Sequence, residues 1–370
     1  MHQFIGQNFT KPCCDYTIES NKPPIEYWNS DELATLRKTL EQGIWPAGCN
    51  SCKHKELENQ LSLRQRSLQE YNVPSIPKVE FVDVRLSNKC NFACRTCEPI
   101  FSSRIAKESS VHDLHEYYGY SLDKNYIEHS EQISQDIKSM LPEIKKLMFT
   151  GGEPTYIEQF YDILDTCDKN IHLLVTTNAS MIDERFLSYA KQFPNLHITL
   201  SIDGIGDTAE YIRYGTLWSE VDKNIKKILE LKCSVMYNTV LSAYSVLGLE
   251  DLVDYIIVHE QDAYGADMYI CTNPVHLHPC VLPQSVRNNL TTTIQKCIIK
   301  LSNSKRATDY RNAIQSLNDL LKQLDSVYLD NKKFIDFTKK LDSIRNQKYD
   351  NWYLWSDRVW KRHCGGHARR

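Results

Sequence analysis

The chain has 370 residues, of which 41% are hydrophobic and 25% are charged, and its formal net charge is −3. This length is enough for one large α/β domain with an appendage, and the composition is ordinary for a globular protein. The near-neutral charge excludes a global basic field that would recruit nucleic acid or an acidic membrane surface. The sequence has no apolar stretch of the roughly 18 residues that a membrane span needs and no signal-peptide pattern, so we expect a cytoplasmic protein.

The first 75 residues predict a small cysteine-rich module, 1–75, that precedes the main domain. Ser30 is suited to cap a helix over 31–41, and Pro74 and Pro77 mark a linker into the next segment. The module's cysteines form two groups that are remote in sequence, namely Cys13 with Cys14, and Cys49 with Cys52. Two such groups predict a second metal site, for which zinc and an iron–sulfur cluster are both compatible on spacing alone.

From residue 79 onward, strand-like and helix-like segments alternate. The expected strands are short and apolar, and they cover 79–86, 145–150, 171–177, 197–203, 234–241 and 266–272. The expected helices have apolar residues at three- and four-residue steps, and they cover 129–141, 155–167, 181–192, 219–232 and 245–259. This alternation is typical of an α/β fold with a parallel sheet, so residues 76–285 are predicted to form a partial (βα)6 TIM-like barrel. A helical C-terminal region, 286–370, would follow, with helices over 286–303, 307–325 and 331–346.

Three cysteines lie close together directly after the first of these strands, and they are Cys90, Cys94 and Cys97. Thiols this close in sequence converge on one point, and three ligands leave a metal centre with an open coordination position. The C-x3-C-x2-C spacing and the place after a strand favour an iron–sulfur cluster in an active loop of the barrel. A zinc site and a set of buried core cysteines are the alternatives.

Polar residues at the ends of the next three strands predict one pocket at the same rim. They are Gly151, Gly152, Glu153 and Pro154 after the second strand, Asn178 after the third, and Ser201, Asp203 and Arg213 after the fourth. The glycines let a ligand approach the backbone, and the Glu153 carboxylate suits a cationic amino group. Ser201 and Asp203 offer acceptors for ribose hydroxyls or an amine, and Arg213 suits a carboxylate. Taken singly, each motif is equally compatible with a tight turn or a helix cap.

These motifs together resemble the radical S-adenosylmethionine (radical SAM) superfamily over roughly residues 79–285. Cys90-x3-Cys94-x2-Cys97 is similar to its cluster motif, and Gly151-Gly-Glu-Pro154 is similar to its motif for the SAM amine. Ser201-Ile-Asp-Gly with Arg213 resembles the segment of the SPASM/twitch subgroup that contacts the SAM ribose and carboxylate. The resemblance implies a [4Fe-4S] cluster on the three thiolates, with SAM bound to its unique iron. It also implies reductive cleavage of SAM to a 5′-deoxyadenosyl radical, with an electron donor such as flavodoxin or ferredoxin.

The N-terminal module resembles a SPASM-type domain that has moved to the front of the chain, and 337–345 resembles a C-terminal segment of small twitch-type proteins of phages and bacteria. This resemblance implies an auxiliary [4Fe-4S] cluster on Cys13, Cys49 and Cys52. Cys364 is expected as its fourth ligand and Cys14 is the alternative, because adjacent cysteines rarely reach one iron without strain. Thr96 departs from the family pattern, since many members carry an aromatic residue there, near the adenine.

Three functions follow from this pattern. A radical SAM enzyme that modifies a peptide or protein side chain is the first hypothesis, because many relatives with SPASM domains do so. Radical modification of a nucleotide, modified base, sugar or other small molecule is the second. A zinc-binding interaction protein without catalysis is the alternative from another class, and its metal content would distinguish it.

Overall fold

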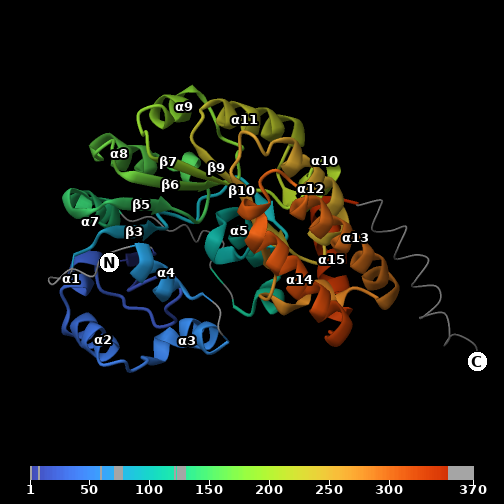
Figure 1. Ribbon diagram of the computed structural model, residues 1–370, viewed down its shortest axis with the longest axis horizontal. Helices are drawn as coiled ribbons and strands as arrows, with labels where there is room; N and C mark the ends of the chain where they lie inside the picture. The colour runs from blue at the N-terminus through green and yellow to red at the C-terminus, as the bar shows by residue number, and fades with distance from the viewer. Residues whose placement is uncertain are drawn as a thin grey trace, which may run out of the picture.

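The computed structural model of the protein describes residues 2–6, 9–58, 61–70, 78–120, 122 and 131–348. An eight-stranded sheet in the order β10-β9-β7-β6-β5-β3-β1-β2 forms its centre (Figure 1). Its strands are β1 (His2–Ile5), β2 (Thr10–Lys11), β3 (Phe81–Val84), β5 (Lys146–Phe149), β6 (His172–Thr177), β7 (Leu196–Ser201), β9 (Ser234–Leu241) and β10 (Gly265–Ile270). Neighbouring strands are parallel, except that β2 is antiparallel to β1.

The six strands from β3 to β10 are those that the sequence predicts, and each pairs with the next one along the chain. Helices connect them, so every connection is a βα crossover of the kind found in parallel barrels. The two ends of the sheet, β10 and β2, are not paired with each other in the described residues. The α/β class is therefore confirmed, and the barrel is partial.

The sheet extends beyond those six strands because β1 pairs in parallel with β3. This strand comes from the first residues of the chain, inside the segment that the sequence assigns to a separate module. The N-terminal region thus shares a sheet with the core, and a division of the chain near residue 75 stays a proposal.

The helices have the bounds expected of amphipathic segments and cover the sheet and its ends. Those of the N-terminal region and the cysteine loop are α1 (Pro24–Trp28), α2 (Asp31–Glu41), α3 (Asn50–Leu57), α4 (Leu63–Glu70), α5 (Ser103–His112) and α6 (His115–Tyr118). Those between the core strands are α7 (Glu131–Met140), α8 (Glu158–Thr166), α9 (Glu184–Ala190), α10 (Gly206–Ile212), α11 (Trp218–Glu230) and α12 (Leu249–Val258). The last three are α13 (Gln284–Ser302), α14 (Arg311–Ser326) and α15 (Lys332–Arg345).

These helices confirm the expected amphipathic pattern. In α11, Val221, Ile225 and Ile228 recur at three- and four-residue steps and are buried. In α2, the Ser30 hydroxyl accepts a hydrogen bond from the Leu33 backbone N–H at 3.2 Å, which caps the helix as predicted. Figure 1 shows α7, α8, α9 and α11 along one side of the sheet and the N-terminal helices on the other.

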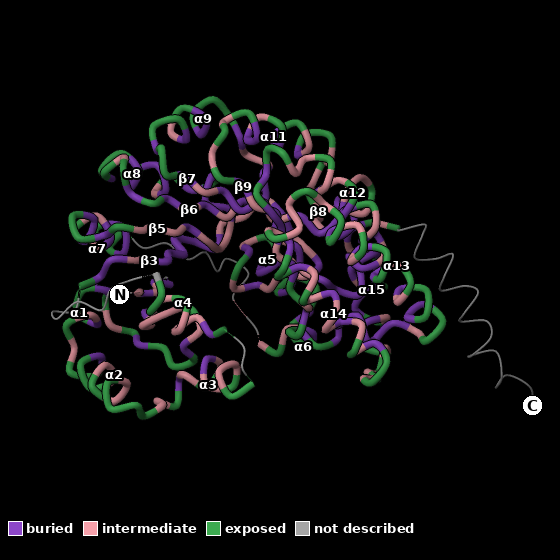
Figure 2. Tube along the Cα trace, in the orientation of Figure 1, coloured by how far each residue is buried: buried purple, intermediate pink, exposed green. Residues whose placement is uncertain are grey.

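The strands have two different faces, which decides where a site can form. Along β9, Val235, Tyr237 and Leu241 are buried in the apolar core, whereas the alternate residues Met236 and Asn238 are only partly buried. Side chains alternate across a strand, so these alternate residues line the inner face of the partial barrel. The strands are mostly buried, whereas α2 is largely exposed and α3 is mainly of intermediate exposure (Figure 2).

Candidate functional site

The cysteine loop follows β3 and is held in place by a small second sheet. In it, β4 (Ala93–Cys94) pairs antiparallel with β8 (Arg213–Tyr214), and Cys94 lies opposite Arg213. The Arg213 guanidinium donates to the Cys94 Sγ at 3.9 Å, across 119 positions of sequence. The structure therefore brings together two motifs that the sequence could only assign separately to the same rim.

The three thiols of this loop are close enough to influence one another. Burial, and after it the neighbouring Cys94, raises the pKa of Cys90 to about 12. Burial also raises the pKa of Cys97, to which Cys94 and Cys90 both contribute. Three crowded, protonated thiols have no evident structural use, whereas metal binding takes up thiolates and releases their protons.

Hydrogen-bond donors point at the sulfurs, which is what an anionic iron–sulfur centre needs. The Phe92 backbone N–H donates to the Cys90 Sγ at 3.5 Å, and the Asn178 side-chain amide donates to the same sulfur at 3.9 Å. With Arg213 beside Cys94, these donors favour sulfur in its negatively charged form. The residues of the loop therefore fit a cluster held by three thiolates.

The Gly151–Gly152 turn needs glycine because the cysteine loop packs directly on it. Both glycines are left-handed, with φ of +68° and +55°. A Cβ at Gly152 would stand 2.4 Å from the carbonyl oxygen of Lys89, and one at Gly151 would stand 2.3 Å from the Arg85 side chain. The Glu153 backbone N–H also donates to the Lys89 carbonyl at 2.8 Å. The turn therefore packs closely against the loop that carries the cysteines, and a larger residue would not fit there.

The Glu153 side chain is buried, with 1% of its surface exposed, and it connects the ends of two strands. Its carboxylate accepts hydrogen bonds from the hydroxyls of Thr155 and Thr177 and from the backbone N–H of Asn178, each at 2.7 Å. These contacts give Glu153 a positioning role between β5 and β6. Pro154 begins the short turn that follows, Pro154–Tyr156. Contact of the Glu153 carboxylate with an amino group stays a proposal.

Asp203 and Arg213 form a buried ion pair next to the cysteine loop. The Arg213 Nη2 lies 3.0 Å from the Asp203 Oδ2, and the Val240 backbone N–H donates to the Asp203 Oδ1 at 2.9 Å. Asn178, Ser201 and Arg213 line one small cavity at this edge of the sheet. The polar residues assigned to the rim after the third and fourth strands therefore do meet in space.

Arg95 is a residue of this site that the sequence analysis missed. Its side chain is fully buried inside the cysteine loop, and its Nη2 donates to the Asp342 Oδ1 of α15 at 2.5 Å. Its guanidinium lies 3.7 Å from the centre of the Tyr211 ring, and the Tyr211 hydroxyl donates to the same Asp342 oxygen at 2.9 Å. The C-terminal helix α15 therefore fixes the cysteine loop. No local signal could reveal a pair 247 residues apart.

The thiols of the N-terminal cysteines have different charged neighbours. Burial raises the pKa values of Cys13 and Cys49, and the charge of Cys52 contributes to both shifts, although the charge that acts most on Cys13 is that of Cys14. Cys14 has a different neighbour, since the charge that most raises its pKa after burial is that of Asp83. The expected ligand Cys364 lies outside the described residues.

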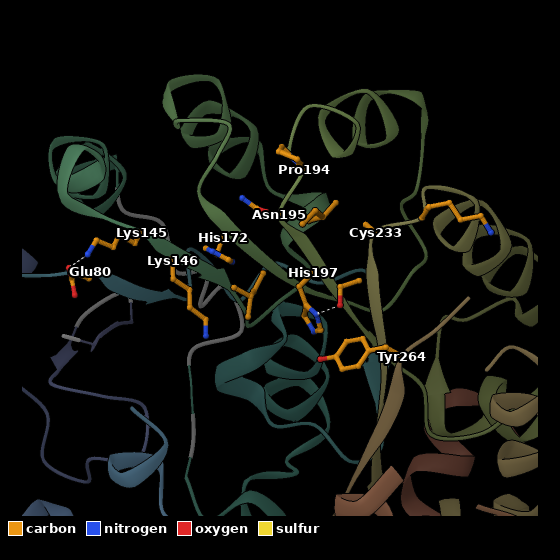
Figure 3. A pocket seen from close by; sticks show the side chains of 13 residues that line it. Glu80, Lys145, Lys146, His172, Pro194, Asn195, His197, Cys233 and Tyr264 are labelled. Atoms are coloured by element: carbon orange, nitrogen blue, oxygen red, sulfur yellow. Dashed lines mark hydrogen bonds and ion pairs between the residues drawn. The ribbon is translucent and has the colours of Figure 1, made fainter. Parts of the chain in front are cut away.

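A large pocket lies at the opposite end of the sheet from the cysteine loop, and Figure 3 shows the side chains that line it. It has a volume of about 1020 Å³, and its lining residues stand at the amino ends of the strands. Lys145 in this pocket is paired with Glu80, whereas Lys146 and His197 come from the inner face of the sheet. Burial lowers the pKa of His197 to about 4, so this imidazole is neutral near pH 7. The cysteine loop lies at the other edge, at the carboxyl ends of the strands, where proteins with parallel sheets have their active-site loops.

Residues 84–256 match the family model of the radical SAM superfamily. This range starts in β3 and includes the cysteine loop, the Gly151–Pro154 turn and the Asp203–Arg213 pair. The superfamily is an enzyme class, and this part of the chain is similar to it. Similarity to this superfamily implies a [4Fe-4S] cluster and SAM, and the residues described above fit both groups.

Two curated proteins are similar to part of the chain, and both are GTP 3′,8-cyclases. The protein from Campylobacter fetus subsp. fetus (strain 82-40) is 26% identical over 167 residues, and that from Aliarcobacter butzleri (strain RM4018) is 25% identical over 170 residues. Each match covers 44% of this chain and 47% of the relative. The chain thus spans about half the length of the curated relatives it matches.

The solved structures that are similar to the chain have low TM-scores and low sequence identity to it. They include anSMEcpe with bound AdoMet, with a TM-score of 0.44 and 17% identity over 63% of each chain. They also include Streptococcus suis SuiB bound to the precursor peptide SuiA, with a TM-score of 0.41 and 18% identity over 73% of this chain and 57% of SuiB. Within the described residues, no helix has the length and apolar character that crossing a membrane requires.

Proposed function

We propose that the protein is a radical SAM enzyme that cleaves SAM reductively and abstracts a hydrogen atom from a peptide or protein side chain. The observation that carries this proposal is the junction of β4 and β8, which sets the Cys90–Cys97 loop against Arg213 and Asp203. The cluster, when bound, supplies the electron that divides SAM into methionine and a 5′-deoxyadenosyl radical. The chain's own residues bind, orient and shield these groups.

Different residues of the rim bind the cluster and the different polar groups of SAM. Cys90, Cys94 and Cys97 hold the cluster and leave one position open for SAM. The Gly151–Gly152 backbone offers polar groups to the SAM amine, since no side chain blocks the approach. Arg213 is the cation beside the cluster that suits the SAM carboxylate, and Asp203 holds its orientation at 3.0 Å.

The proposal includes an auxiliary [4Fe-4S] cluster of the SPASM/twitch type on Cys13, Cys49 and Cys52. The mutual influence of their thiols supports it. The side chain of Cys14 is engaged elsewhere, with Asp83, which favours Cys364 as the fourth ligand. A small reductant such as flavodoxin or ferredoxin would supply electrons to the protein, which we propose acts in the cytoplasm.

The large pocket supports a bulky substrate. Its volume of about 1020 Å³ lies at the upper end of the range for small-molecule sites, and it opens onto the inner face of the sheet. Because the pocket lies at the opposite end of the sheet from the cysteine loop, it would hold a distant part of a long substrate such as a peptide, and the reacting side chain would lie at the loop.

A nucleotide is the second candidate substrate, and two observations favour it. Lys145, Lys146 and Lys232 give the pocket cationic groups that suit phosphates, and both curated relatives are GTP 3′,8-cyclases. Lys145 and Lys232 are already paired with Glu80 and Asp262, which leaves less charge for a triphosphate.

A single anaerobic assay tests the activity and separates the two substrate classes. The reconstituted protein is incubated with SAM and dithionite, and 5′-deoxyadenosine is measured by mass spectrometry. We expect 5′-deoxyadenosine above the level given by a protein without iron. Addition of GTP would stimulate its formation and yield a modified nucleotide only if the second candidate is correct. A colourless protein that contains zinc and no iron would overturn both.

A further inference from the structure

Three potential metal ligands meet near the edge of the sheet, and one of them, Cys14, follows the proposed cluster ligand Cys13 in the sequence. One ring nitrogen of His2, the Cys14 Sγ and one carboxylate oxygen of Asp83 all lie within 4.8 Å of one another. They come from three segments, because His2 is on β1, Asp83 is on β3, and Cys14 is in the loop after β2. The register pairs His2 with Phe81, two residues before Asp83, so the two strands present these side chains on one face.

The polar atoms of this group lack the partners that buried atoms normally have. Both ring nitrogens of His2 are shielded from solvent, and within the part of the chain that the structure describes neither has a hydrogen-bond partner. Asp83 is 5% exposed, and its Oδ1 accepts from the Thr150 hydroxyl at 3.2 Å. Buried polar groups in native proteins are nearly always satisfied, so a further group is needed here. A cation between the three side chains would satisfy the imidazole and the carboxylate at once.

The group is also arranged in advance of any ligand. The His2 ring stacks on Phe81 with centroids 4.1 Å apart, which fixes its orientation. Ligand atoms around tetrahedral zinc stand roughly 3.5 Å apart, so atoms already within 4.8 Å need to move by only about 1 Å to close on an ion. Cys14 is exposed, which provides a route of entry from solvent.

The charge of the surroundings selects the kind of ion. Lys11 and Lys146 stand near the site, with their ammonium groups 5.1 Å and 4.9 Å from the Phe4 and Phe81 rings. A divalent ion with one neutral imidazole, one thiolate and one carboxylate forms a neutral unit, which adds no positive charge beside these lysines. One sulfur, one nitrogen and one oxygen ligand suit a borderline ion such as Zn²⁺, whereas Mg²⁺ and Ca²⁺ require oxygen ligands.

We propose that His2, Cys14 and Asp83 form a mononuclear site for a zinc-like divalent cation, with a fourth position open to solvent or to a polar group of a ligand. The site is distinct from the two proposed clusters and does not depend on SAM chemistry. The Thr150 hydroxyl, one residue before Gly151, donates to Asp83 and links the site to the rim.

Zinc binding to the full-length chain with its iron–sulfur clusters reconstituted tests this proposal. One equivalent of Zn²⁺ is added anaerobically, zinc is counted by elemental analysis after desalting, and Zn K-edge X-ray absorption gives the ligands free of interference from iron. We expect about one zinc per chain with one sulfur at about 2.3 Å and two or three nitrogen or oxygen ligands at about 2.0–2.2 Å.

Variants separate this site from the cysteine groups. Cys14→Ser and His2→Ala are each expected to weaken zinc retention more than tenfold, since even indirect contacts to a metal are worth about that much. His172→Ala, which removes an imidazole from β6, a strand separated from β3 by β5, is the matched control and should retain zinc. Cys14→Ser alters an exposed residue, so a folding failure will not mask the result.

The outcomes decide the matter in either direction. Zinc retained at full stoichiometry in both Cys14→Ser and His2→Ala would overturn the proposal. So would a spectrum with three or four sulfur ligands, or zinc that is lost only from the double variant Cys49→Ser, Cys52→Ser, because the metal would then occupy the other cysteines. Failure of 5′-deoxyadenosine formation would bear on the proposed function and leave this site unaffected.

Discussion

The two cysteine groups of the chain lie in very different surroundings. The loop that carries Cys90, Cys94 and Cys97 is held by a sheet edge, by the β4–β8 pair and by the buried Arg95–Asp342 ion pair. Cys49 and Cys52 lie on a single 3₁₀ turn and the short helix α3, in which Cys52 is the one buried residue. The first group is thus held by the fold before any metal arrives, whereas the second has little core of its own and is expected to need its metal for folding.

The largest effect on activity is expected from removal of the first cysteine group. Changing Cys90, Cys94 and Cys97 together to Ala should reduce 5′-deoxyadenosine formation to background, because the variant cannot hold the cluster that binds SAM. The fold should survive, since packing and ion pairs rather than the metal fix this loop. Circular dichroism and anaerobic product analysis check both halves, and 5′-deoxyadenosine formation at the unaltered rate would contradict the assignment.

The second group should respond in the opposite way. The double variant Cys49→Ser, Cys52→Ser should lose about four irons per chain and the protection of residues 31–57 against hydrogen exchange, while the sheet stays protected. Iron analysis and hydrogen exchange by mass spectrometry measure the two effects. Cys233→Ser, which alters a cysteine outside both groups, is the control. Unchanged iron would remove the auxiliary cluster from the proposal.

The ion pair that holds the first cysteine group can be removed without changing a cysteine. Arg95→Ala leaves the Asp342 carboxylate buried without its ion-pair partner, and breaking such a pair typically costs about 3–5 kcal/mol of stability. Thermal unfolding of the protein would show a large fall in Tm. Arg185→Ala, which breaks the exposed pair with Glu158, should have little effect on Tm. Equal decreases in Tm for the two variants would show that the buried Arg95–Asp342 pair contributes no more to stability than the exposed pair does.

The smallest effect is expected at the glycine turn, and a matched pair of variants isolates it. Gly152→Ala and Gly43→Ala both place alanine at a positive φ, of +55° and +75°, which costs about 1–2 kcal/mol. Only at Gly152 does the new Cβ meet a backbone oxygen, at 2.4 Å, whereas at Gly43 it meets open space. Gly152→Ala should therefore also weaken SAM binding, measured by calorimetry, and Gly43→Ala should not. Equal SAM affinity in both would argue against contact between this turn and SAM.

Much of the core was predictable because it follows from local patterns. The six parallel strands, the helices between them and the three C-terminal helices all come from periodicities within about 20 residues. The cysteine loop and the polar strand ends were also predictable, because parallel strands bring their carboxyl ends to one edge. The Ser30 cap of α2 follows the same rule of local chemistry, and the structure confirms it.

Other features were decided only by the tertiary structure, because they join segments that are far apart in the chain. Strand β1 has four residues, too few for a periodicity, and it is recognisable only through its pairing with β3. Arg95 finds Asp342 across 247 positions, and no local pattern predicts such a pair. The adjacent residues Cys13 and Cys14 have the same side chain and nearly the same sequence context, yet it is the Cys14 Sγ that lies within 4.8 Å of a His2 ring nitrogen and an Asp83 carboxylate oxygen. Sequence determines which ligands are present, but the direction of each side chain depends on the segments that pack around it.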